Sequence, residues 1–198
     1  MVNLRSRVTR LGVLDIGSNT IHMLIVDAAP GARPDPEAST KSTVRLMQYV
    51  KDDGSIKKSG IEAILTAVDQ CMELAEEYDI TQLLAMATSA IKEAPNSNKI
   101  LRKIEERIGQ SVTVLSGTDE ARLTFLAARR WYGWDAGRLL MLDIGGSSLE
   151  VAMGSDEEPT VALSAAAGAC RITREYLPEG TASVDELEVV RKKVRRIL

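Results

Sequence analysis

Two short stretches with the same layout carry the residues that could do chemistry. The first, LGVLDIGSNTIHMLIVD, covers residues 11–27, and the second, LLMLDIGGSSLEVAMG, covers residues 139–154. Each has an apolar run ending in an aspartate, then a turn of small and hydroxyl-bearing residues, then a second apolar run. Such a turn leaves backbone N–H groups free and lets phosphate oxygens approach, because glycine has no Cβ. Either turn alone could be a hairpin without a ligand, but the pair predicts two anion-binding loops.

The carboxylates beside the turns predict a cation. A carboxylate next to a bound phosphate is repulsive unless a positive ion lies between them. Mg2+ suits this position, because one or two carboxylates, water and substrate phosphates commonly hold it. We therefore expect Asp15, Asp143 and Glu150 to bind Mg2+ or its water ligands. The alternative for Glu150 is an exposed strand residue without this role.

Apolar periodicity predicts the elements that position the first turn. Short apolar runs indicate strands, and recurrence at three- and four-residue steps indicates amphipathic helices. Residues 28–43 carry three prolines and are predicted to form a loop. The expected order is βββαβαβα, with strands at 11–16, 21–27 and about 44–50, a helix at 59–77, a strand at 82–89, a helix at 98–108, a strand at 111–116 and a helix at 119–131.

The order of elements then begins again around the second turn. We expect strands at 138–143, 148–154 and about 160–167, a short helix at about 170–176, and a last helix that begins with a capping box of Ser183 and Glu186. Asp143 lies 128 positions after Asp15, so three strands are expected twice. The sequence thus predicts an α/β protein with a first domain at 1–130 and a second, incomplete copy of the same unit at 131–198.

Composition excludes several classes of protein. The formal net charge is −3 and the sequence pI is about 5.4, which argues against a protein that coats nucleic acid. Apolar runs are too short for a membrane helix, and the basic start lacks the continuous apolar core of a signal peptide. Cys71 and Cys170 have no metal-binding spacing and are expected to be reduced thiols. We expect a cytoplasmic protein without nucleic-acid or membrane partners.

Two further features have more than one interpretation. His22, the only histidine, lies beside the first turn and is expected to be structural rather than a general base. The segment RRWYGW at 129–134 could line a nucleic-acid groove, but is better explained as a helix end with packing aromatics. Six arginines could supply local positive charge for a phosphate chain, namely Arg122, Arg129, Arg130, Arg138, Arg171 and Arg174.

Four motifs together resemble one known family. DIGSNTIHMLIVD, MATSAIKEAPN, LSGTDEARLTF and DIGGSSLEV, in this order and spacing, resemble the bacterial exopolyphosphatase and guanosine pentaphosphate phosphohydrolase family. That family lies within the actin, sugar kinase and Hsp70 ATPase superfamily. The resemblance implies a ribonuclease H-like fold of the actin-like ATPase type. Catalytic cores of this family are normally longer than this chain, so we expect a fragment of a longer protein.

The resemblance also implies a role for each site residue. The first phosphate loop would comprise Asp15 with Gly17, Ser18, Asn19 and Thr20, and the second would comprise Asp143 with Gly145, Gly146, Ser147 and Ser148. Glu120, in the motif SGTDEA, would position and deprotonate the attacking water. Its expected place in the first turn of a helix also favours a carboxylate. Lys92 would balance phosphate charge.

This sequence departs from the family pattern at two positions. Ser147 stands where the family usually has a third glycine, and serine would cost about 1 kcal/mol or more if this position needs a positive φ. Lys92 stands where relatives commonly have arginine. Lysine keeps the charge but loses the bidentate fork of a guanidinium group.

The implied activity is Mg2+-dependent release of terminal phosphate from inorganic polyphosphate. Hydrolysis of guanosine pentaphosphate is the alternative within the family. A kinase or ATPase of the same superfamily would need an adenosine-binding segment, and the SGTDEAR motif is not a kinase feature. A non-catalytic sensor of phosphate or alarmone would bind the ligand without releasing phosphate. A homodimer is an assembly that the sequence leaves open.

Overall fold

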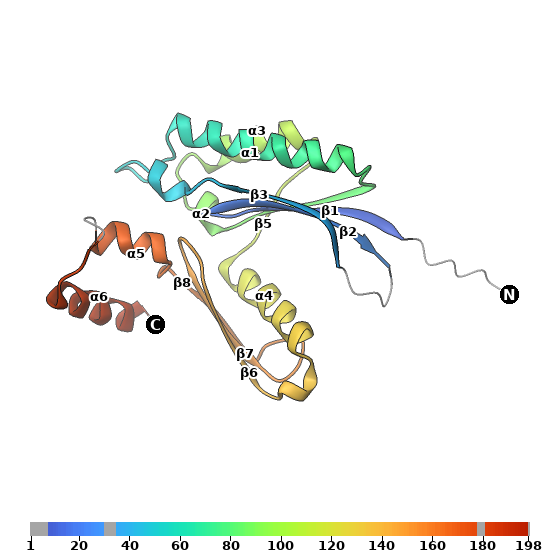
Figure 1. Cartoon of the computed structure of the whole chain (residues 1–198). Coiled ribbons are helices and arrows are strands. Elements are labelled where there is room, and N and C mark those ends of the chain that lie inside the picture. Colours follow the sequence, from blue (N-terminus) through green and yellow to red (C-terminus); the bar gives the residue numbers. More distant parts are fainter. Residues whose placement is uncertain (1–7, 30–34, 178–180, 198) are drawn as a thin grey trace. The chain divides into compact units, whose positions relative to one another are not determined.

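The computed structural model describes residues 8–29, 35–177 and 181–197. The chain divides into two compact units, one formed by residues up to Ala87 with Ile91–Val114, the other by Thr88–Ala90 with Leu115–Leu198. Figure 1 labels their elements. The two units divide before helix α4 (Gly117–Tyr132), because α4 packs on the sheet of the second unit. The boundary predicted from the sequence lies at residue 130.

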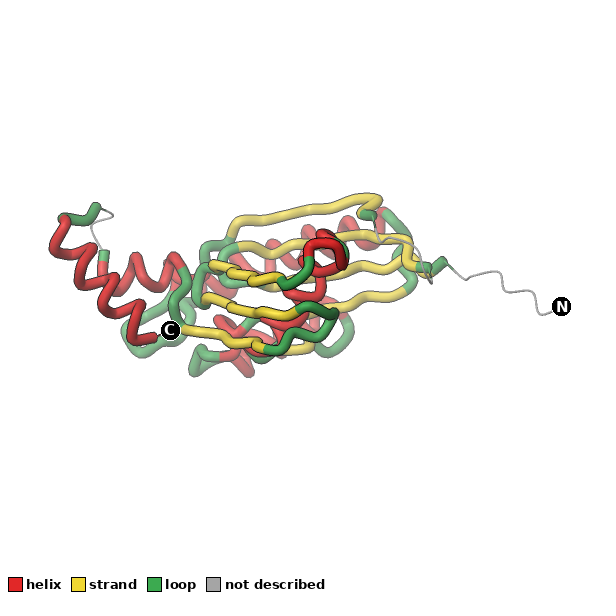
Figure 2. Tube along the Cα trace, turned by 90° about the horizontal axis from the view of Figure 1, so that it is seen from below, coloured by secondary structure: helices red, strands yellow, loops and turns green. Residues whose placement is uncertain are grey.

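The first unit is built on a five-stranded mixed sheet. Its strands are β1 (Thr9–Ile16), β2 (Thr20–Ala28), β3 (Pro36–Thr43), β4 (Gln82–Ala87) and β5 (Thr113–Val114), in the order β3-β2-β1-β4-β5. The first three strands are antiparallel neighbours, whereas β4 runs parallel to β1 and β5 parallel to β4. Within each sheet of the protein the strands run side by side, as the yellow segments of Figure 2 show.

The third strand was predicted at the wrong place. Residues 44–50 do not form a strand, because Leu46–Tyr49 is a short 3-10 helix, η1. The strand is instead β3, inside the segment predicted as a loop, and it pairs with β2 from Thr43 opposite Thr20 to Pro36 opposite Val26. β3 is an edge strand of mostly polar residues, so it carries no apolar run that the sequence could reveal.

Two helices cover one face of the first sheet. α1 (Lys58–Glu77) packs on β2, β3 and α3 (Ser97–Ile108), and Figure 1 shows both helices on the same side of this sheet. Their buried residues recur at helical spacing, as predicted, for example Ile64, Val68 and Cys71 in α1. α3 ends at Gly109, which has the left-handed conformation expected of a C-cap glycine (φ 72°). A short helix, α2 (Ser89–Lys92), follows β4.

The second unit has a three-stranded antiparallel sheet with α4 on one face. The strands β6 (Leu139–Ile144), β7 (Leu149–Gly154) and β8 (Val161–Ala165) lie in chain order, as predicted. Phe125 of α4 is completely buried and lies close to Gly154, where a Cβ would be 3.2 Å from the ring. The 3-10 helix η2 (Trp134–Ala136) links α4 to β6, and α5 (Ala169–Tyr176) and α6 (Val184–Ile197) follow β8.

The second sheet also carries apolar side chains that are exposed. Leu142 lies opposite Val151, which in turn lies opposite Leu163, so the three form one row across the strands. Leu142 and Leu163 are exposed, as are Leu140 and Ile144 on β6. This concentration of exposed apolar residues is unusual for a monomeric surface.

The last helix begins as predicted. The Ser183 hydroxyl accepts a hydrogen bond from the Glu186 N–H at 3.3 Å, and a carboxylate oxygen of Glu186 accepts from the Ser183 N–H at 2.8 Å. These bonds are the two halves of a capping box. The backbone and hydroxyl bonds from Ser183 lower the pKa of Glu186. Among the helices that the structure describes, none has the length and apolar character needed to cross a membrane.

Candidate functional site

The first candidate phosphate loop is a tight hairpin turn between β1 and β2. The Gly17 N–H donates to the Thr20 carbonyl oxygen at 2.9 Å and closes the turn. A Cβ on Gly17 would lie 2.9 Å from that same oxygen, so any larger residue would push the turn open. The turn residues are therefore held close together by the absence of a side chain at position 17.

The chain segment after β3 binds the carbonyl groups of this first turn. The Val44 and Arg45 N–H groups both donate to the Asn19 oxygen at 2.9 Å, and the Leu46 N–H donates to the Ser18 oxygen at 2.8 Å. The carbonyls are thus directed at the start of η1. Residues 44–46 are not a strand, but they fix the orientation of the turn.

The second candidate loop, between β6 and β7, has the same construction. The Gly145 N–H donates to the Ser148 oxygen at 3.0 Å, and a Cβ on Gly145 would lie 3.3 Å from that oxygen. The segment after β8 again binds the carbonyls of the turn: the Ala169 N–H donates to Gly145 at 2.9 Å and the Arg171 N–H donates to Gly146 at 3.0 Å. These donors belong to the first turn of α5.

In each turn two successive N–H groups of the described chain are left for another acceptor. Within the part of the chain that the structure describes, the N–H groups of Ser18, Asn19, Gly146 and Ser147 donate to no backbone carbonyl. Successive free N–H groups in a turn form a concave site that suits an anion. The two turns therefore share the hydrogen-bond pattern of an anion-binding loop, while their origin in a duplicated unit stays a prediction.

Ser147 fits its position without backbone strain. Among the described residues other than glycine, only Arg45 and Asp79 have a positive φ, so Ser147 does not need the left-handed region. Its side chain is buried, and its carbonyl oxygen accepts from the Gly168 N–H at 3.2 Å and from Arg171 Nε at 2.9 Å. The serine at this position therefore carries no energetic cost from a positive φ.

Two of the three candidate metal ligands lie side by side. Asp143 on β6 is directly opposite Glu150 on β7, which is opposite Ser164 on β8. Glu150 is only 1% exposed and accepts a hydrogen bond from the Ser164 hydroxyl at 2.8 Å. Two carboxylates directly opposite each other on a sheet repel, so this pair favours a cation between them.

The third candidate ligand, Asp15, belongs to the first unit. It lies opposite His22 on β2, and His22 lies opposite Lys41 on β3. Desolvation by surrounding protein atoms raises the pKa of Asp15, and the charge of His22 opposes that shift. Across the described residues, no group of three or more histidine, cysteine, aspartate or glutamate side chains is placed to hold a metal. Any Mg2+ bound by these carboxylates would need water and phosphate ligands as well.

Glu120 lies half-buried in the first turn of α4, as expected. Ser116 caps this helix, since its hydroxyl accepts from the Asp119 N–H at 3.1 Å, and the Glu120 N–H donates to the Ser116 carbonyl at 2.9 Å. The start of α4 lies against β8, because a Cβ on Gly117 would be only 2.3 Å from the Ser164 hydroxyl. The second unit therefore brings the helix turn that carries Glu120 next to the Ser164–Glu150 pair.

Lys92 is an exposed residue at the end of α2. α2 follows β4, whose last residues Met86 and Ala87 pair with Asp15 and Ile16. Lys92 thus belongs to a helix that starts at the same edge of the sheet as the first turn.

Three of the arginines expected to supply positive charge are engaged elsewhere. Arg129 is completely buried, and its two terminal nitrogens donate to the carbonyls of Gly133 (3.1 Å), Gly137 (2.6 Å) and Gly154 (3.0 Å). Arg122 pairs with Glu158 at 3.1 Å and Arg130 with Glu157 at 2.8 Å. Gly133 ends α4 with φ 72°, as the helix-end interpretation of this segment predicts.

Three residues that support the site were not predicted. Gly117, Ser164 and Gly168 make the close contacts that hold α4, β8 and the second turn together. The run of small residues SAAAGA at 164–169 was a signal for close backbone packing, but small residues alone do not reveal their partners.

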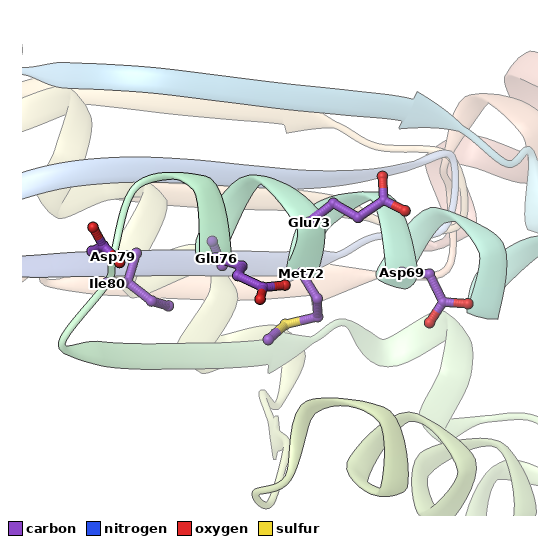
Figure 3. Close-up of a pocket in the computed structure, with 7 residues that line it drawn as sticks. Asp69, Met72, Glu73, Glu76, Asp79 and Ile80 are labelled. Atoms are coloured by element: carbon purple, nitrogen blue, oxygen red, sulfur yellow. The ribbon is translucent and has the colours of Figure 1, made fainter.

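A hollow of about 600 Å3 lies along the C-terminal half of α1, away from the predicted site residues. Figure 3 shows Asp69, Glu73, Glu76 and Asp79 around it. Asp69 is paired with Arg107. The carboxylates around the hollow make it negatively charged, so it is unsuited to a phosphate ligand.

The sequence of this chain is similar to those of curated exopolyphosphatases. Exopolyphosphatase 1 of Mycobacterium tuberculosis is 51% identical to this chain over 170 residues, which are 86% of this chain and 49% of that protein. The corresponding protein of Mycobacterium leprae is 49% identical over 170 residues, covering 86% of this chain and 50% of that protein. The chain thus spans about half the length of the curated relatives it matches.

Solved structures agree with the fold. A crystal structure of an exopolyphosphatase from Cytophaga hutchinsonii superposes with a TM-score of 0.87 at 25% identity, over 96% of this chain and 61% of that chain. The Ppx/GppA family member of Aquifex aeolicus gives 0.73 at 22% identity, over 91% of this chain and 58% of that chain. The expected α/β fold of the actin-like ATPase type is confirmed by these likenesses. Since the model of the Ppx/GppA phosphatase family also matches residues 24–198, this chain belongs to that family.

Proposed function

We propose that the protein to which this chain belongs is an exopolyphosphatase that uses Mg2+ to release the terminal phosphate of inorganic polyphosphate. The observation that carries the proposal is the pair of hairpin turns, each with carbonyls bound on one side and N–H groups left for an anion. The mycobacterial relatives, named exopolyphosphatases, support polyphosphate as the substrate class.

The turns would bind phosphate oxygens through their backbone. Ser18 and Asn19 in the first turn, and Gly146 and Ser147 in the second, have N–H groups that could donate to the phosphoryl oxygens. The hydroxyls of Thr20 and Ser148 are further candidate donors. Lys92 would add a positive charge at the edge of the first sheet.

Asp143 and Glu150 would hold Mg2+ together with water and substrate phosphate, and Asp15 is a separate candidate ligand in the first unit. The position of Asp143 and Glu150 directly opposite each other on β6 and β7 is the observation that favours a cation there. Bound Mg2+ would neutralise negative charge on the phosphate groups. Ser164, which donates to one oxygen of Glu150, would keep the second oxygen of that carboxylate directed away from β8.

Glu120 would act on the attacking water. In the proposed step its carboxylate accepts a proton from water while the water oxygen bonds to the terminal phosphorus. The bond from that phosphorus to the bridging oxygen breaks, which releases orthophosphate and leaves a chain one phosphate shorter. The first turn of α4 is a favourable place for this carboxylate, because a helix N-terminus favours negative charge.

Replacing Glu120 by glutamine in the full-length protein tests this proposal. Glutamine keeps the shape but cannot accept the proton, so phosphate release from polyphosphate should fall by about 10² to 10⁴. Asp119→Asn, in the same helix turn, is the matched control and should stay within a few-fold of the wild type. Glu120→Gln activity within a few-fold of the wild type would refute the assignment.

The two other candidate activities can be separated by direct measurement. Turnover of polyphosphate and of guanosine pentaphosphate under the same conditions compares the two substrates of the family. A sensor would bind either ligand and release no phosphate with Mg2+ present. The unstrained backbone of Ser147 gives no reason to favour a sensor over an enzyme.

A further inference from the structure

A basic surface lies at one end of α1 and α3, apart from all the residues proposed for catalysis. It consists of Lys51, Lys58, Lys99, Arg102 and Lys103, which line two adjoining hollows of about 370 and 580 Å3. Asn96, Lys99 and Lys103 border both hollows. We call these five cations the α1–α3 basic surface. They gather in a chain whose formal net charge is −3.

Most of this positive charge is not neutralised by the protein. Lys58 pairs with Glu62 at 3.5 Å. Within the described ranges the other four cations form no ion pair, and the one further acid lining the hollows is Glu106. The nearby carboxylate of Asp53 accepts hydrogen bonds from the N–H and hydroxyl of Ser55 at 2.8 and 2.6 Å, and of the five cations it interacts with Lys51.

The helix ends at this surface reinforce the positive potential. α1 and α3 both begin here, their N-cap residues Lys57 and Asn96 make no side-chain cap bond, and neither helix has an acid in its first turn. The Asn96 side chain instead binds the backbone N–H and carbonyl of Ile56. Lysines at the positive end of a helix oppose its dipole, so helix stability does not explain their position.

The opposite end of α1 shows the same reversal. The acidic hollow of Figure 3, with Glu73 and Glu76, lies toward the negative end of the helix. No basic residue occupies the last turn of α1. Both ends therefore carry the sign of charge that destabilises the helix, which points to a role for the charges outside folding.

The chemistry of the hollows favours phosphate groups without bases. None of the residues that line them is aromatic, whereas proteins that bind single-stranded nucleic acids stack bases on aromatic rings. The surface is in the same unit as the first turn: Lys51 lies five residues after Leu46, whose N–H binds the Ser18 carbonyl. A long chain of phosphates could therefore contact this unit at two places.

We propose that the α1–α3 basic surface is an accessory binding site for long inorganic polyphosphate chains, away from the end that is hydrolysed. This inference rests on the proposed function, because it assumes polyphosphate as the substrate. Its binding strength would come from charge and counterion release, so it should fall steeply with salt. Short substrates would not use the surface.

Binding of long-chain polyphosphate to this chain, measured by calorimetry at several salt concentrations, tests the inference. The double variant Lys99→Gln/Lys103→Gln should lose about tenfold in affinity at low salt, and the slope of log K against log salt should fall by about 1.4. The control variant Lys192→Gln/Lys193→Gln, which changes the net charge equally on α6, should change affinity less than threefold. Circular dichroism should show the same helix content in all three proteins.

Three outcomes would overturn the inference. The first is an unchanged affinity for long chains in the Lys99/Lys103 variant, and the second is an equal loss of affinity in the α6 control. The third is a single-stranded RNA that binds the wild type as tightly as long-chain polyphosphate does and loses as much affinity in the Lys99/Lys103 variant. The test is separate from that of the proposed function. In the full-length protein, hydrolysis of tripolyphosphate should survive the lysine changes, whereas Glu120→Gln should lower hydrolysis by about 10² to 10⁴ and leave long-chain binding unchanged.

Discussion

Gly168 lies directly against the backbone of Ser147. A Cβ on Gly168 would be 2.4 Å from the Ser147 carbonyl carbon, a distance that real contacts do not reach, and the Gly168 N–H donates to the Ser147 oxygen at 3.2 Å. The start of α5 and the second candidate phosphate loop are thus packed as one piece. The orientation of the N–H groups in that loop depends on a residue about twenty positions later in the chain.

Gly168→Ala should displace the second turn. The added methyl group meets rigid backbone, so we expect the free energy of unfolding to fall by about 1 to 3 kcal/mol and anion binding to weaken with it. Gly12→Ala is the control, because a Cβ there would meet the far ends of the Ile80 and Leu83 side chains, which can move. Urea unfolding and polyphosphate binding measure both effects. Equal stability of the two variants would contradict the rigid contact.

Ser147→Gly should bring no benefit, although glycine matches the family pattern. Ser147 has no positive φ and its carbonyl is already held by Gly168 and Arg171. Glycine would add conformational freedom to the unfolded chain, so stability should fall by up to about 1 kcal/mol. Chemical denaturation of the two proteins checks this. A stabilisation of that size would mean that serine is strained in the native turn.

The sequence predicted the elements that carry strong patterns and missed those that do not. The apolar periods of β1, β2, α1 and α4 located them to within two residues, and Gly109 marked the end of α3. β3 escaped because an edge strand of polar residues needs no apolar face. Both turns were identified by composition.

The contacts that orient the site could not be predicted in the same way. The Gly117–Ser164 and Gly168–Ser147 contacts join segments that are 47 and 21 positions apart, and nothing in one segment specifies its partner. Arginines were expected to supply charge for the ligand, yet Arg129 binds three carbonyls inside the protein. Burial of a charged residue is set by tertiary packing, which a single sequence does not show.

Arg129 and Arg130 should respond very differently to the same substitution. Arg129→Lys keeps the charge but loses the fork that reaches the carbonyls of Gly133, Gly137 and Gly154, so we expect a loss of about 2 to 4 kcal/mol in the free energy of unfolding. Arg130→Lys changes an exposed pair with Glu157 and should cost less than about 1 kcal/mol. Thermal and urea unfolding of the two variants provide the comparison. Similar losses would show that the buried arginine is not a structural centre of the second unit.

The buried thiol of Cys71 should make the first unit less stable as the pH rises into the alkaline range. Its side chain is completely buried in α1, and burial raises the pKa of the thiol from 9.0 to about 11. The unfolded chain then loses the thiol proton at a lower pH than the folded chain. The stabilisation that the buried, protonated thiol gives the folded state is fully present below pH 9 and is lost as pH rises toward 11. The free energy of unfolding should therefore drop by about 1 kcal/mol between pH 8 and 10.

Thiol labelling and a cysteine variant test this directly. At pH 8 the half-buried Cys170 should react with a thiol reagent well before Cys71, because only an exposed thiolate is reactive. Cys71 should become labelled at the rate at which the first unit opens. Cys71→Ala should show a smaller fall in stability between pH 8 and 10 than the wild type, since the titrating group is gone. Equal falls in both proteins, or equal labelling rates for the two cysteines, would show that the Cys71 thiol is not held in the protein interior.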